Sequence, residues 1–255
     1  MLDKDGVLSD VIKPAKYSFI EVSKKISKNW SNILIDLPNE QFKSLLKQGL
    51  MFQNKVINNI PTYLRAYAYV LTELLNGYVD LIRFKEMFKI IERNSISLNS
   101  LTQSFVKFAY EEPMFEHAVN MLNMLPNNIP ITVISSSEGV TLWMKKELKR
   151  NGIDKSICIY ERIENKTNVL YKLSLNSVGL FFTDSISDVI YSIRAREKGS
   201  NINVYGVLTG LSNEIDFYKY NVNVFDNVLE GVNYAFLPLV FHLFRHHQYN
   251  THEIK

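Results

Sequence analysis

Hydrophobic positions divide the chain into a helical first part and a mixed second part. From about Val11 to Glu112, apolar residues recur at intervals of three and four, the spacing of a buried helix face. Four such stripes stand out: Phe42, Leu45, Leu46 and Leu50; Tyr63, Tyr67, Val70, Leu71, Leu74 and Leu75; Phe84, Met87, Phe88 and Ile91; Leu101, Phe105, Phe108 and Ala109. The pattern predicts an all-helical block of about 100 residues with an aromatic core, within the normal size of a small domain.

In the second part, short apolar runs alternate with amphipathic stretches of helical spacing. The runs are Ile131–Ile134, Ile157–Tyr160, Val178–Phe182, Val204–Val207 and Val222–Phe225. Strands this apolar are typical of a parallel sheet covered on both faces. The sequence therefore predicts a doubly wound, Rossmann-like α/β core, whose functional residues are expected at the carboxyl ends of the strands.

Composition narrows the classes of function. The 255 residues carry a net charge of +3, too mild to indicate nucleic-acid binding. The most apolar stretch, Tyr234 to Phe244, contains Pro238 and is too short to span a bilayer. The single cysteine, Cys158, excludes an internal disulfide, suits a reducing compartment and is expected to be buried within its apolar run. We expect a cytoplasmic protein without nucleic-acid or membrane partners.

Polar residues gather at three of the predicted strand ends: Asp3 and Asp5, Ser135, and Asp184 with Asp188. Gly6 allows the chain to turn directly after the first two carboxylates. Asp184 and Asp188 lie four positions apart and project from one helix face. Clustered carboxylates can hold a divalent cation and attack an electrophile. Two alternatives stay open here: a solvated acidic turn, and acids that favour a helix N-terminus.

Taken in order, these motifs carry a resemblance to a known family. Asp3-x-Asp5-Gly6-Val7-Leu8, then Ile131–Ile134 with Ser135, then Lys166, then Phe181-Phe182-Thr183-Asp184-x-x-x-Asp188 resemble the haloacid dehalogenase-like (HAD) hydrolase superfamily. Within it, the chain looks most like the phosphoglycolate phosphatase and β-phosphoglucomutase type. The resemblance implies a HAD-like core domain at 1–10 and 112–255. It also implies an inserted helical cap domain at 11–111.

The resemblance implies roles for the carboxylates. Asp3 would be the nucleophile that forms an aspartyl-phosphate, and Asp5 the general acid and then the general base. Mg²⁺ would be held by Asp3, by the backbone carbonyl of Asp5 and by Asp184, with Asp188 and water completing its shell.

The same resemblance implies a phosphate site. Ser135, with Ser136 and nearby backbone amides, would bind the transferring phosphoryl group. Lys166 would neutralise its charge. Lys172, further along the same predicted helix, is the competitor for the lysine role.

These roles imply a Mg²⁺-dependent phosphatase that acts on a small phosphorylated metabolite. A phosphomutase of the same family and a catalytically silent binding protein are the alternatives. The second aspartate of the first motif favours phosphate esters over halide displacement. The histidines His242, His246 and His247 include a pair at helical zinc-site spacing, but no third ligand is in view, so no zinc site is predicted. The sequence predicts neither the phosphoester nor the oligomeric state.

Two features depart from the family pattern. Thr183 stands where glycine usually precedes the acid of the last motif. Only Met1 and Leu2 precede Asp3, although a central strand normally supplies four or five apolar residues there. An empty central position would leave backbone groups of both neighbouring strands unpaired. We therefore expect further apolar residues to be encoded in frame upstream of Met1.

Overall fold

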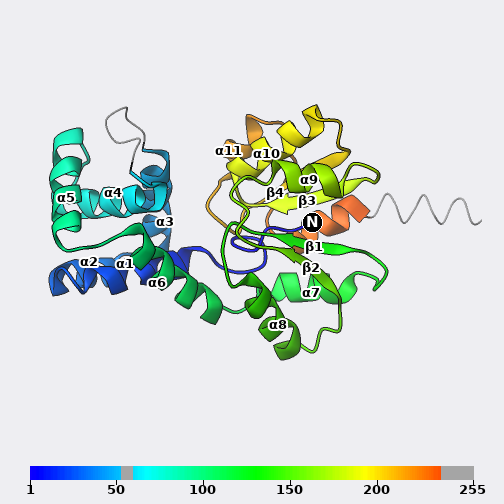
Figure 1. Cartoon of the computed structure of the whole chain (residues 1–255), viewed down its shortest axis with the longest axis horizontal. Coiled ribbons are helices and arrows are strands. Elements are labelled where there is room, and N and C mark those ends of the chain that lie inside the picture. The colour runs from blue at the N-terminus through cyan, green and yellow to red at the C-terminus, as the bar shows by residue number, and fades with distance from the viewer. Residues whose placement is uncertain (53–59, 237–255) are drawn as a thin grey trace, which may run out of the picture. The chain divides into compact units, whose positions relative to one another are not determined.

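The structure is a computed structural model that describes residues 1–52 and 60–236. The chain forms two compact units, coloured by residue number in Figure 1. The α/β unit comprises Met1–Ser9 and Met114–Lys255, and the helical unit comprises Asp10–Pro113. Both crossings between the units therefore fall next to Ser9 and Met114, which pair in an antiparallel bridge.

The helical unit follows the apolar stripes of the sequence. Its helices are α1 (Ile12–Ser23), α2 (Lys28–Asp36), α3 (Asn39–Met51), α4 (Thr62–Asn76), α5 (Leu81–Arg93) and α6 (Leu98–Glu111). Side-chain caps at Asp80 and Ser97 begin α5 and α6, because they satisfy backbone N–H groups that lack helical partners. Phe19 lies in the core and contacts the rings of Phe42 and Tyr67 edge-on. The predicted aromatic core is confirmed by the burial of these rings.

A parallel sheet forms the centre of the α/β unit. Its strands are β1 (Ile131–Ile134), β2 (Ile157–Tyr160), β3 (Gly179–Thr183), β4 (Ile202–Val207) and β5 (Val224–Phe225). β1 pairs with β2, and β4 pairs with both β3 and β5, always in parallel. Leu2 bridges Val133 and Phe182 in parallel, so that it joins the two groups of strands.

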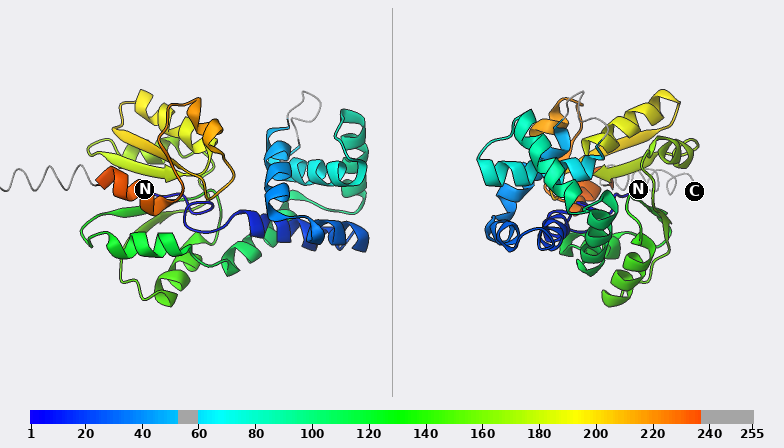
Figure 2. Two further views of the ribbon diagram at one scale, coloured as in Figure 1. Left: turned by 180° about the vertical axis from the view of Figure 1, so that it is seen from behind. Right: turned by 60° about the vertical axis from the view of Figure 1, so that its left-hand side comes forward.

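Helices of the α/β unit pack on either side of the sheet because neighbouring residues of each strand point to opposite faces. These helices include α7 (Glu116–Met124), α8 (Val140–Arg150), α9 (Thr167–Leu173), α10 (Ile186–Glu197) and α11 (Glu214–Tyr218). Phe182 packs with residues of α7 and α8, whereas Phe181 packs with residues of α9, α10 and α11. Figure 2 shows the green helices on one side and the yellow ones on the other. The mixed α/β class with parallel strands is confirmed.

The first three residues occupy the central position of the sheet. The N–H of Leu2 donates to Thr132 at 2.8 Å, and the N–H of Ile134 donates to Leu2 at 2.9 Å. On the other side, the N–H of Phe182 donates to Met1 at 3.1 Å. The central position of the sheet is therefore occupied by these first residues, which pair with the strands on both sides. The expectation about residues encoded upstream of Met1 stays a prediction.

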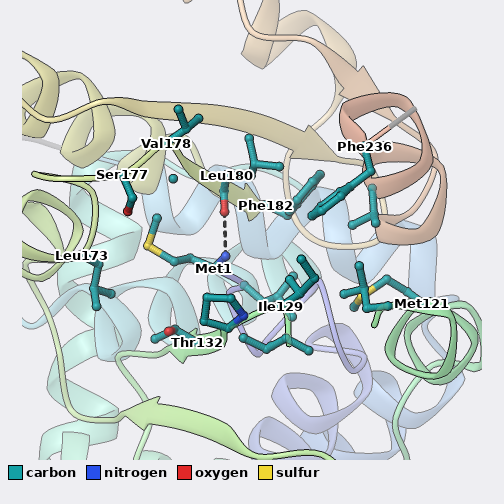
Figure 3. Close-up of a pocket in the computed structure, with 16 residues that line it drawn as sticks. Met1, Met121, Ile129, Thr132, Leu173, Ser177, Val178, Leu180, Phe182 and Phe236 are labelled. Atoms are coloured by element: carbon teal, nitrogen blue, oxygen red, sulfur yellow. Dashed lines mark hydrogen bonds between the residues drawn. The ribbon is translucent and has the colours of Figure 1, made fainter. Parts of the chain in front are cut away.

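An apolar cavity of about 360 Å³ adjoins Met1 between the first residues of β1 and β3 (Figure 3). The terminal amine of Met1 donates to the carbonyl of Leu180 at 2.6 Å. Burial lowers the pKa of this amine to about 5, since an apolar environment disfavours the ammonium form.

One expectation about the sheet is wrong. Cys158 is exposed rather than buried, because β2 pairs only with β1 in the described sheet and therefore has an open edge. Two other sequence features, the end of the apolar stretch after Phe236 and the three histidines, lie outside the described residues. Within the described ranges, no helix has the length and hydropathy needed to cross a membrane.

Candidate active site

Three of the loops that form the candidate site meet at the carboxyl ends of the central strands. The first loop follows Leu2 and carries Asp3 and Asp5. The second follows β3 and carries Asp184, and the third follows β4. The hydroxyl of Thr209 in the third loop donates to the carbonyl of Gly6 in the first. The N–H of Leu211 donates to Asp184 Oδ2 at 2.9 Å. These contacts tie the loops into one site.

Lys166 is the centre of the site. Its side chain is almost fully buried, and the residue is only 3% exposed. Its Nζ lies 3.0 Å from Asp3 Oδ2 and 2.5 Å from Asp188 Oδ2. Lys172, the competing lysine, is exposed on α9. Of the two candidates, the structure therefore brings only Lys166 to the aspartates.

The electrostatics of the site follow from burying several carboxylates together. Burial raises the pKa of Asp3 well above its ordinary value; attraction by Lys166 opposes this shift, and repulsion from Asp188 and Asp184 adds to it. Burial raises the pKa of Asp184 to about 7, and its backbone hydrogen bond opposes that shift. Burial alone would lower the pKa of Lys166, but Asp3 and Asp188 outweigh it and raise this pKa. The site therefore holds a lysine that stays charged beside acids that are costly to ionise.

Asp188 has a different environment from the other acids. Its Oδ2 accepts from Lys166 and also from the hydroxyl of Thr183 at 3.0 Å. The same Thr183 oxygen accepts from the N–H of Ser185 at 3.0 Å. Thr183 thus fixes both the turn after β3 and the carboxylate that holds Lys166, a role that its unusual identity in the motif does not reveal.

Asp184 is enclosed by backbone. A Cβ added to Gly6 or to Gly210 would collide with the Asp184 carboxyl group. Gly6 also has a φ of 78°, in the left-handed region that other residues rarely adopt. The two glycines therefore leave space around this carboxylate that any side chain would fill.

The serine loop after β1 reaches the second aspartate. The hydroxyl of Ser137 donates to Asp5 Oδ2 at 2.7 Å. Ser135 is buried, and its Oγ accepts from the N–H of Ser137 at 3.0 Å. Ser136 is exposed. Sequence reasoning selected Ser135 and Ser136 in this loop and missed Ser137, although all three stand at the same strand end.

The residues present fit a Mg²⁺ ion. In the described parts of the chain, no three histidine, cysteine or carboxylate side chains form a metal cage by themselves. Mg²⁺ usually keeps several waters and takes only one or two carboxylates. The buried carboxylates of Asp3 and Asp184, with the Asp5 carbonyl, match that donor set. Burial, with a smaller contribution from repulsion between the neighbouring carboxylates, raises the pKa values of Asp3 and Asp184, and a bound cation would favour their ionised forms.

Known proteins give a structural match but no match by sequence. No protein-family model and no curated protein matches the chain. A solved structure described as a phosphoglycolate phosphatase from Lactobacillus delbrueckii subsp. bulgaricus aligns with a TM-score of 0.56 at 10% identity, covering 92% of this chain and 95% of that one. The chain has the fold of HAD-like hydrolases.

Other solved structures align with lower TM-scores. A HAD-like hydrolase family protein from Streptococcus pneumoniae aligns at a TM-score of 0.46 with 15% identity, covering 91% of this chain and 95% of that one. A protein described as a β-phosphoglucomutase from Thermotoga maritima also aligns at 0.46 with 15% identity, covering 92% and 96%. The HAD-like fold itself rests on the higher-scoring match, and the chemistry of this chain has to be argued from its own site.

Proposed function

We propose that the protein is an enzyme, a Mg²⁺-dependent phosphatase that hydrolyses a small phosphomonoester through an aspartyl-phosphate on Asp3. One observation carries the proposal: the buried Lys166 joins Asp3 to Asp188 at the carboxyl end of a HAD-like sheet. A buried lysine and several carboxylates add little to stability by themselves. They do suit the transfer of a charged phosphoryl group.

The proposed reaction has two steps. A carboxylate oxygen of Asp3 attacks phosphorus, and the bond to the leaving alcohol oxygen breaks while Asp5 gives that oxygen a proton. Asp5 then takes a proton from water, which attacks the phosphoryl group, releases phosphate and restores Asp3. Lys166 and the loop that contains Ser135 and Ser136 bind the phosphoryl oxygens. Mg²⁺, when bound, supplies charge neutralisation and orients the phosphoryl group.

A phosphatase screen tests this function. The protein is expected to release inorganic phosphate from at least one small phosphoester in a broad panel. Removing Mg²⁺ with a chelator is expected to lower the rate by roughly 100-fold or more, since a metal ion stabilises such a transition state by several kcal/mol. Phosphate is measured colorimetrically. Absence of release across the panel with Mg²⁺ would contradict the proposal, and accumulation of a sugar bisphosphate instead would identify a phosphomutase.

We also propose that the helical unit serves as a cap that selects the substrate. It is inserted between the first and second motifs, and the α/β unit has hydrophobic cores of its own on both sides of its sheet. In HAD-like enzymes with such an insert, a cap would exclude water from the aspartyl-phosphate and contact the leaving group.

Excision of the helical unit tests the cap role. Ser9 and Met114 pair directly, so a short Gly-Ser turn can replace residues 10–113. The excised protein is expected to cleave small activated esters but to lose selectivity, so that the spread of kcat/KM across the panel narrows by roughly tenfold or more. A folded excised protein with undiminished selectivity would rule out the cap role.

A further inference from the structure

Lys4, between the two aspartates of the first motif, has an unusual environment. It is only 2% exposed, whereas lysine is almost never fully buried unless it is paired. Its Nζ lies 2.7 Å from Asp5 Oδ1 and 4.8 Å from the ring centroid of Trp143. Trp143 belongs to α8 and is itself buried. The lysine is therefore held by an ion pair and by an aromatic face at once.

Both oxygens of Asp5 are engaged by side-chain donors from different parts of the chain. Oδ1 accepts from Lys4 Nζ, and Oδ2 accepts from Ser137 Oγ at 2.7 Å. Two donors on the two oxygens fix the plane of a carboxylate as well as its position. This matters because a general acid must lie within hydrogen-bond reach of the atom it protonates. A misplacement of about 1 Å can cost roughly 100-fold in rate.

We propose that Lys4 is a positioning residue that holds the carboxyl group of Asp5 in the orientation needed for protonating the leaving oxygen. The inference rests on the proposed function, because it presumes that Asp5 is the general acid. Lys166 already neutralises the nucleophile side of the site. Lys4 acts on the other side, through Asp5, and has no contact with the reacting phosphorus in this mechanism.

The dependence of rate on the leaving group tests this role. Lys4→Met keeps a straight side chain against Trp143 but removes the ammonium. For an alkyl phosphate, whose alkoxide leaves poorly, kcat/KM is expected to fall by about 100-fold, the lower range of general acid catalysis. For 4-nitrophenyl phosphate, whose leaving group needs little protonation, the fall should be less than about threefold. Because kcat/KM reports only the steps up to departure of the leaving group, the later water step does not mask this difference.

Three variants sharpen the experiment. Lys4→Arg keeps the charge and should restore most of the activity towards the alkyl phosphate. Ser137→Ala removes the other donor to Asp5 and should show the same dependence on the leaving group as Lys4→Met. Lys172→Met removes an exposed lysine from the same unit and should change neither substrate's rate.

The outcomes separate this inference from the proposed function. An equal fall for both esters would assign Lys4 a merely structural role, and no fall would remove its role altogether; either result overturns the inference. If the unaltered protein releases phosphate from no ester of the broad panel, the proposed function fails, and the role of Lys4 in proton transfer fails with it. Crystal structures of the unaltered protein and Lys4→Met then still show whether Asp5 turns away from Ser137 when the lysine is lost. An unchanged Asp5 contradicts the inference independently of activity.

Discussion

Replacing Asp3 by asparagine is expected to abolish turnover while leaving the fold intact. Asparagine has the same shape, so the backbone pairing around Leu2 is kept, but its amide cannot form the aspartyl-phosphate. Loss of the nucleophile should lower kcat by roughly 1,000-fold or more. Since burial makes the charged form of Asp3 costly, the free energy of unfolding should change by no more than about 1 kcal/mol. Steady-state kinetics and urea unfolding measure the two quantities.

A trapped intermediate makes the Asp3 experiment specific. Acid quenching with a radiolabelled substrate should capture labelled protein from the unaltered chain and none from Asp3→Asn. Asp154→Asn is a suitable control, because it makes the same chemical change at an exposed position of the same unit. Turnover of Asp3→Asn within about tenfold of normal would contradict the mechanism.

Replacing Lys166 by methionine should affect both activity and stability. Methionine has a similar length, but it leaves Asp3 and Asp188 buried without their shared cation. Removing one partner of a buried ion pair typically costs about 3–5 kcal/mol, and the transferring phosphoryl group would lose its neutralising charge. We expect a markedly lower urea midpoint in the metal-free protein, and turnover reduced by roughly 100-fold or more.

Two further variants assign the effect of Lys166→Met to the buried charges. Lys172→Met, on the same helix but exposed, should change the stability by less than about 0.5 kcal/mol. Adding Asp188→Asn to Lys166→Met removes one of the stranded carboxylates. The double variant should therefore lose less stability than the sum of the two single changes. If the stability losses of the two single variants simply add, Lys166 and Asp188 do not act as a unit.

Most strand positions could be predicted from the sequence, because a buried parallel strand is a short local run of apolar residues. The run Ile131–Ile134 coincides with β1, and Ile157–Tyr160 with β2. The order of the strands within the sheet has no such local pattern in the sequence. The exposure of Cys158 depends on β2 having one partner in the described sheet, and the pairing of Leu2 on both sides depends on residues more than 100 positions away.

The candidate site was predictable only where residue types repeat a motif. Asp3, Asp184, Asp188 and Lys166 were selected from the sequence and lie together, although their chemical roles stay predictions. Lys4 was overlooked, because lysine is ordinarily a surface residue and nothing local indicates that Trp143, far along the chain, covers it. Ser137 could not be distinguished from Ser136 by type, since only the turn after β1 decides which hydroxyl reaches Asp5.

The exposed edge of β2 also has a practical consequence. Cys158 is the sole cysteine of the sequence and its thiol is accessible, so a maleimide dye will label the unaltered protein at one defined position on the α/β unit. A second cysteine introduced on an exposed face of α5, for example at Lys85, would complete a donor–acceptor pair across the two units. Single-molecule energy transfer between the dyes would then follow the separation of the units in solution as substrate and Mg²⁺ are added.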